Sequence, residues 1–123
     1  MVRLQTIRDQ RGCLTIAEKL PFNVKRVYWL HHLTGPRGGH AHRKLDRLLI
    51  AAAGSFLAVL NGAPYRLWTP EEAVRIPPLT WLDLRDFSSD AVCMILASDE
   101  YDEGDYIRDY VDFERILAGV AQR

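Results

Sequence analysis

The chain has 123 residues, enough for one hydrophobic core, and we expect residues 1–123 to form a single domain. Lysine plus arginine and aspartate plus glutamate number 16 each, so the formal net charge is zero and nothing points to a nucleic-acid partner. The longest apolar run, residues 48–60, is too short to span a membrane, and residues 1–5 lack the apolar stretch of a signal peptide; we therefore expect a cytoplasmic protein.

The first part of the chain predicts short strands separated by turns. Residues 13–16 and 22–30 are predicted strands, and the second is rich in β-branched and aromatic side chains. Along that second strand Arg26, Tyr28 and Leu30 share one face, because side chains alternate along a strand. Residues 35–39 hold three glycines and a proline, which predicts a loop.

A pair of histidines, His40 and His42, follows this loop directly. Residues two apart on a strand point the same way, so both imidazoles enter the interior together if the strand faces inward. Imidazoles titrate near neutral pH and suit proton transfer or metal binding. The alternative is a pair of surface histidines, which the adjoining glycine-rich loop disfavours because such loops let a ligand approach the backbone.

The rest of the chain continues the strand pattern and ends in a helix. Glycines flank residues 48–53 and 55–60 and favour two strands, and Asn61–Gly62 predicts a tight hairpin leading to a strand at 65–68. Residues 92–97 predict a buried strand. Apolar residues at 113, 116, 117 and 120 have helical spacing, with Asp112 as the candidate N-cap. Many short strands with one terminal helix predict an all-β sandwich or barrel.

Five segments together resemble a known family: residues 11–15, 21–28, 37–42, 86–90 and 96–108. Over about residues 7–113 the chain resembles the WxcM-like cupin sugar 3,4-ketoisomerases. The resemblance implies a cupin, or jelly-roll, β-barrel that forms a homodimer, often with exchanged N-terminal strands. It also implies an isomerase of deoxysugar biosynthesis that converts dTDP-4-keto-6-deoxyglucose to a dTDP-3-keto-6-deoxyhexose.

The resemblance implies roles for seven residues. His40 and His42 match the catalytic motif and would move protons through an enediol without a metal. The candidate substrate-binding residues are Tyr28, Arg37, Arg26, Tyr106 and Arg108. Without the resemblance, Tyr28 is a packed aromatic residue and Arg26 is a solvated or paired one. Tyr106 and Arg108 have an equally acceptable structural interpretation, in which they pair with the acidic run 99–105 and fasten the last strand.

We expect no metal and no cofactor. A cupin metal site uses a Glu four residues after the histidine pair and a third His from a later strand, and this chain has Asp46 and Leu82 there. No Gly-x-Gly-x-x-Gly segment follows a strand, so a nicotinamide cofactor is not expected. Relatives often carry Trp-His where this chain has Trp81–Leu82, and an acidic-glutamine pair where it has Asp46–Arg47.

Three alternatives to the isomerase remain open at this point. The same imidazole pair suits a sugar-nucleotide epimerase. A non-catalytic cupin that binds sugar nucleotides is compatible with the departure at Leu82. A metal-dependent cupin oxygenase requires a ligand set that includes a carboxylate not recognised in the sequence.

Overall fold

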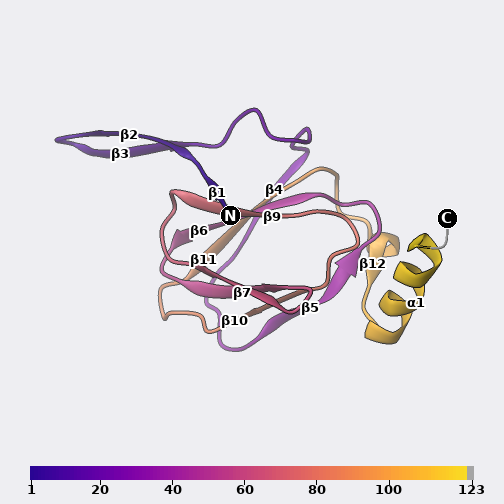
Figure 1. Ribbon diagram of the computed structural model, residues 1–123. Coiled ribbons are helices and arrows are strands. Elements are labelled where there is room, and N and C mark those ends of the chain that lie inside the picture. Colours follow the sequence, from indigo (N-terminus) through magenta and orange to yellow (C-terminus); the bar gives the residue numbers. More distant parts are fainter. Residues whose placement is uncertain (122–123) are drawn as a thin grey trace.

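The structure is a computed structural model that describes residues 1–121, and its main body is two antiparallel sheets that face each other (Figure 1). The first sheet has five strands, which in spatial order are β1 (Val2–Arg3), β9 (Glu72–Ile76), β6 (Arg47–Ala53), β11 (Val92–Ala97) and β4 (Arg26–Leu30). The second has β12 (Tyr106–Ile107), β5 (Arg37–His42), β10 (Leu82–Arg85), β7 (Phe56–Leu60) and β8 (Ala63–Leu67). The expected all-β barrel of the cupin type is confirmed.

The space between the sheets holds the main hydrophobic core. Inward residues alternate with outward ones along each strand, so β6 contributes Leu49 and Ala51 to this core while Leu48 and Ile50 face outward. The outward residues are covered by the N-terminal segment, through Leu4 and its neighbours. The histidine-bearing strand β5 therefore belongs to a barrel whose inner side chains are fixed by tight packing.

Helix α1 (Tyr110–Ala121) packs on the outside of the second sheet through the buried Phe113. The predicted cap at Asp112 is wrong: the carboxylate of Asp109 accepts hydrogen bonds from the backbone N–H groups of Val111 and Asp112, which is the N-cap arrangement. Val120 is exposed and lies outside the packed face. No helix within residues 1–121 is both long and apolar enough to cross a membrane.

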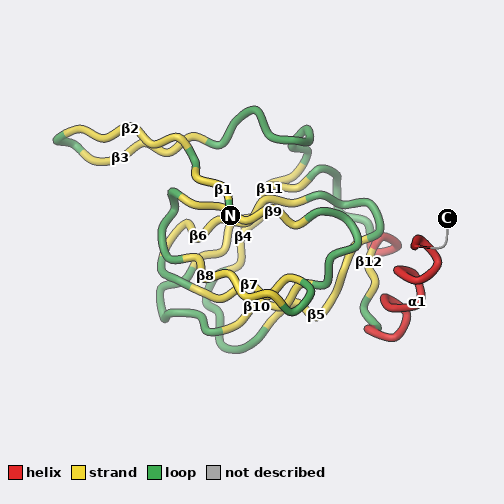
Figure 2. The backbone as a smooth tube through the Cα atoms, viewed as in Figure 1, coloured by secondary structure: helices red, strands yellow, loops and turns green. Residues whose placement is uncertain are grey.

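The predicted strand at 22–30 is shorter in the structure and starts at Arg26, while the hairpin at Asn61–Gly62 is confirmed, with both residues at positive φ. The sequence did not predict the strands at residues 2–3 and 5–9, β9 and β10, or the short 3₁₀ helix η1 (Glu103–Asp105) before β12. The predicted loop at 35–39 is shorter in the structure, because β5 starts at Arg37. A separate hairpin, β2 (Gln5–Asp9) with β3 (Gly12–Ile16), extends away from the barrel (Figures 1 and 2).

Candidate active site

The histidine pair lies at the end of β5 and faces the barrel interior. The intervening Ala41 points outward and is buried with Phe113 of α1, so the alternation of the strand turns His40 and His42 inward. The ring centroids of the two histidines are 5.2 Å apart, and only 2% of His42 is exposed. The interpretation of these residues as a surface pair is therefore wrong.

Asp105 fixes the orientation of His42. The Nδ1 atom of His42 lies 3.1 Å from Oδ2 of Asp105, and the same carboxylate accepts backbone hydrogen bonds from Lys44 and Leu45. Strand β12 brings Asp105 to this position, because Tyr106 pairs with His42 across the sheet. A carboxylate only accepts hydrogen bonds, so a neutral His42 donates from Nδ1 and keeps its lone pair on Nε2.

Both histidines are neutral at physiological pH. Burial, reinforced by the positive charge of Arg47, lowers the pKa of His40 from 6.5 to about 4. The same two causes lower the pKa of His42 to about 4, against the opposing effect of its hydrogen bond to Asp105. Within residues 1–121, Nε2 of His42 is buried without a hydrogen-bond partner. A neutral imidazole whose Nε2 lone pair accepts no hydrogen bond is suited to accept a proton.

His40 borders a cavity of about 230 Å³ inside the barrel. The polar side chains around this cavity are those of Tyr28, Arg37, His40, Arg47, Tyr106 and Arg108. Four of the five predicted substrate-binding residues are therefore brought together next to a histidine. Arg47, which is buried in the same wall, was missed as a site residue, and in the sequence it was one more charged residue at the start of an apolar run.

Arg26, the fifth predicted substrate-binding residue, does not line this cavity and packs on Tyr28 instead. Its guanidinium stacks on the Tyr28 ring, 4.6 Å from the centroid. It also lines a second cavity of about 250 Å³, which it shares with His42 and Asp105. Arginine side chains therefore line both the cavity that His42 borders and the cavity that His40 borders.

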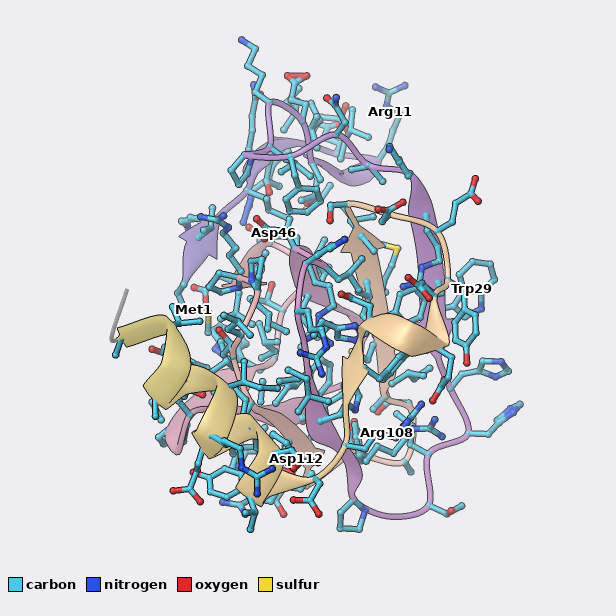
Figure 3. The ribbon with its side chains drawn as sticks, turned by 90° about the vertical axis from the view of Figure 1, so that its right-hand side faces the viewer. Met1, Arg11, Trp29, Asp46, Arg108 and Asp112 are labelled. Atoms are coloured by element: carbon cyan, nitrogen blue, oxygen red, sulfur yellow. The ribbon has the colours of Figure 1, made fainter. Side chains whose placement is uncertain are left out.

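Tyr106 packs against the histidine pair and Arg108 pairs with the acidic run, while the substrate role of both residues stays a prediction. The Tyr106 ring centroid lies 4.2 Å from that of His42 and 5.1 Å from that of His40. The guanidinium of Arg108 lies over the Tyr106 ring, 4.2 Å from its centroid, and forms an ion pair with Glu103. Figure 3 views the barrel from the side that carries β12 and α1, with Arg108 labelled on the segment between them.

The residues that a cupin would use as further metal ligands do not complete such a set. Leu82 pairs directly with His40 across the sheet and supplies no ligand atom. Asp46 does not join the histidines, because its carboxylate accepts hydrogen bonds from Arg75. No group of three potential ligands occurs among the described residues 1–121. The expectation of metal-independent chemistry stays a prediction.

Comparison with known proteins identifies relatives of the chain. A family profile described as "FdtA: WxcM-like, C-terminal" matches residues 1–118. A TDP-4-oxo-6-deoxy-alpha-D-glucose-3,4-oxoisomerase from Aneurinibacillus thermoaerophilus is 39% identical over 98% of this chain and 93% of its own length. A 3,4-ketoisomerase from Helicobacter canadensis is 36% identical, with a TM-score of 0.90 and 94% of each chain covered.

A further solved relative is QdtA, a sugar 3,4-ketoisomerase from Thermoanaerobacterium thermosaccharolyticum in complex with TDP. It is 35% identical and covers 94% of this chain and 90% of its own, with a TM-score of 0.90. A mutant of the same enzyme has been solved with TDP-4-keto-6-deoxyglucose, at 33% identity and a TM-score of 0.86, with the same coverage.

The barrel and its inward histidine pair define a cupin-type protein equipped for acid–base chemistry. The chain belongs to the WxcM-like family and is an isomerase of the sugar 3,4-ketoisomerase class.

Proposed function

We propose that the protein converts TDP-4-keto-6-deoxyglucose to a TDP-linked 3-keto-6-deoxyhexose. The observation that carries the proposal is the inward pair of neutral histidines, one of which borders a cavity lined by arginines. The related enzymes named above act on or bind this nucleotide sugar. The cavity of about 230 Å³ is a reasonable size for one hexose ring.

The reaction moves a carbonyl from C4 to C3 by two proton transfers at carbon. A base removes the proton from C3, the C3–H electrons form a C3=C4 double bond, and O4 becomes an oxyanion. The O3 proton then moves to O4, which leaves the negative charge on O3, and C4 takes up a proton, so that the product has a carbonyl at C3 and a hydroxyl at C4. We assign removal of the C3 proton to His40, because His40 borders the cavity. We assign to His42, which Asp105 orients, a supporting role in the delivery of the proton to C4.

The arginines near the cavity account for recognition of the nucleotide part of the substrate. Arg37 and Arg108 both line the cavity and have exposed side chains, so they can contact a diphosphate that reaches out of it. Charge-assisted hydrogen bonds from arginine to phosphate are among the strongest in proteins. Tyr28 and Tyr106 provide half-buried aromatic walls for the sugar.

Turnover followed by proton NMR tests this proposal. The enzyme is expected to form 3-keto product from TDP-4-keto-6-deoxyglucose, and His40→Asn and His42→Asn are each expected to lower kcat by about 100-fold or more. His31→Asn is the matched control, because His31 is an exposed histidine outside the cavity. An epimerised 4-keto product would favour the epimerase, and nucleotide-sugar binding without any product would favour the non-catalytic binder.

We also propose that the protein acts as a homodimer in the cytoplasm. The hairpin β2–β3 leaves Ile7 and Leu14 half or more exposed, and Trp29 projects from the side of the barrel (Figure 3). Apolar side chains in such positions are suited to burial against a second copy of the chain. Light scattering should give about twice the 14.1 kDa chain mass, and Leu14→Asp should shift the protein toward monomer. A monomeric wild-type protein at micromolar concentration would contradict the dimer.

A further inference from the structure

Arg47 is a buried cation whose side chain forms no ion pair with the carboxylates of residues 1–121. Only 1% of its surface is exposed, although arginine has a long, charged side chain and this one lies at the start of β6. Within residues 1–121, neither Nε nor Nη2 of its guanidinium has a hydrogen-bond partner. Arginine stays protonated at any ordinary pH, so this is a buried positive charge with two unused donors. A residue in this state requires an explanation, because buried polar groups are nearly always paired.

The neighbouring acid does not supply the missing partner. Asp46 precedes Arg47 in the sequence, but its carboxylate accepts both of its hydrogen bonds from Arg75. The two adjacent residues point to opposite faces of the strand, and Arg47 follows Leu49 and Ala51 into the barrel. The charge of Arg47 is therefore directed into the interior.

Within residues 1–121, the titratable groups that act most strongly on Arg47 are two tyrosines and an arginine, none of which is a carboxylate. Burial lowers the pKa of Arg47 below its usual value, and the groups that oppose this most are the phenols of Tyr28 and Tyr106, with Arg26 adding to the repulsion. Arg47 also lines the cavity that His40 borders. An anion that enters this cavity would meet an unneutralised guanidinium next to the candidate base.

The two unused donors lie on the same edge of the guanidinium. Nε–H and one N–H of Nη2 point in parallel and form a fork that fits two neighbouring oxygens in one plane. A cis-enediolate has this arrangement, since O3 and O4 lie in the plane of the C3=C4 double bond and share the negative charge. The 4-keto substrate has instead one neutral carbonyl and one hydroxyl on a tetrahedral carbon, so the fork fits the intermediate better than the substrate.

We propose that Arg47 is a catalytic residue that binds O3 and O4 of the enediolate through Nε and Nη2. The inference rests on the proposed isomerase function and adds a group to it that stabilises the charge formed when C3 loses its proton. Its contribution is made in the transition state and not in the substrate complex, which raises kcat and leaves the substrate affinity almost unchanged.

The test compares two variants of Arg47 with a matched arginine control. Arg47→Met keeps the length of the side chain and removes the charge, which buried sites commonly tolerate. Arg47→Lys keeps the charge and loses the fork. Arg66→Met is the control, because Arg66 is exposed on β8 away from the cavity. Each variant is measured for melting temperature, kcat and KM with TDP-4-keto-6-deoxyglucose, and affinity for TDP.

Arg47→Met is expected to lower kcat by about 100- to 1,000-fold, as for other donors to a developing oxyanion. Arg47→Lys should recover at most about a tenth of wild-type kcat, and TDP affinity and KM should stay within about threefold in both variants. Either variant with kcat within fivefold of wild type would overturn the assignment, as would a loss of TDP affinity that matches the loss of kcat. No 3-keto product from the wild-type enzyme would overturn the proposed function itself, and this inference with it.

Discussion

Replacing Asp105 by Asn tests how the candidate site holds its second histidine. The carboxylate is largely buried and accepts hydrogen bonds from three groups: His42 Nδ1 at 3.1 Å, the backbone N–H of Lys44 at 2.9 Å and that of Leu45 at 3.2 Å. An amide of the same shape has only one oxygen. With its NH₂ group at the Oδ2 position the amide faces both His42 Nδ1 and the Leu45 N–H, and with its NH₂ group at the Oδ1 position it faces the Lys44 N–H, so at least one of the three bonds is lost.

The size of the effect follows from the hydrogen bond that supports the imidazole. A hydrogen bond to a charged group contributes about 1.5–3 kcal/mol, and each 1.36 kcal/mol is a factor of ten. The loss of Asp105 is therefore expected to lower kcat by about 10- to 150-fold. The affinity for TDP should change little, because Asp105 contacts His42 and backbone, not the cavity that His40 borders.

The assay is turnover by NMR, together with the ¹⁵N chemical shifts of His42, which report its tautomer. The shifts should show Nδ1 protonated in the wild type and a mixed or reversed tautomer in Asp105→Asn. Asp109→Asn is the control, because Asn caps a helix as well as Asp does. A folded Asp105→Asn with wild-type kcat and an unchanged His42 tautomer would refute the positioning role.

Three further predictions follow from the same geometry. Because the pKa of His40 and His42 is about 4 in the folded protein against 6.5 in the unfolded one, protons favour the unfolded state: stability should fall as the pH drops from 6.5 to 4, and kcat/KM should fall toward pH 4. The free energy of unfolding, measured by denaturation at several pH values, should depend less steeply on pH in His42→Asn than in the wild type. An equally steep dependence in both proteins would contradict the pKa shift of His42. Gly38→Ala should cost about 2 kcal/mol or more, because Gly38 has φ +91° and an added Cβ would meet the backbone oxygen of Leu82 at 2.6 Å, whereas Gly35→Ala meets nothing within 4 Å and should be nearly neutral in thermal melts. Elemental analysis should find no stoichiometric transition metal, and activity that is lost with chelator and regained with iron, zinc or manganese would reverse this prediction.

The sequence predicts the barrel well where its patterns are local. The alternation along residues 26–30 and the Asn61–Gly62 turn depend on neighbouring residues only, and both appear in the structure as predicted. Strands β9 and β10 were missed because prolines at 70, 77 and 78 suggested turns, while the pairing that holds these strands comes from residues distant in the chain. Strand β4 starts later than predicted for the same reason, since among the described residues 1–121 it pairs with β11 alone and that pairing begins at Arg26.

The candidate site was predictable only in part. The spacing of His40 and His42 indicates that they share a face, but not that this face is inward, which Ala41 decides by packing under α1. Arg47 and Asp105 could not be assigned from the sequence, because each acts on groups that are distant in the chain and are brought near only by the fold. The same charged residue types at Asp46 and Arg75 form an ion pair on another face. Only the fold separates a structural pair from a group that faces the cavity.

Isomerisation in deuterated water tests the central claim most directly. If the neutral histidines move protons through an enediol, the proton taken from C3 can exchange with solvent before C4 is protonated. We therefore predict that TDP-4-keto-6-deoxyglucose gives a 3-keto product that carries deuterium at C4, seen by NMR as loss of the C4 proton signal. A 3-keto product without deuterium at any substrate concentration, or no 3-keto product at all, would contradict the account.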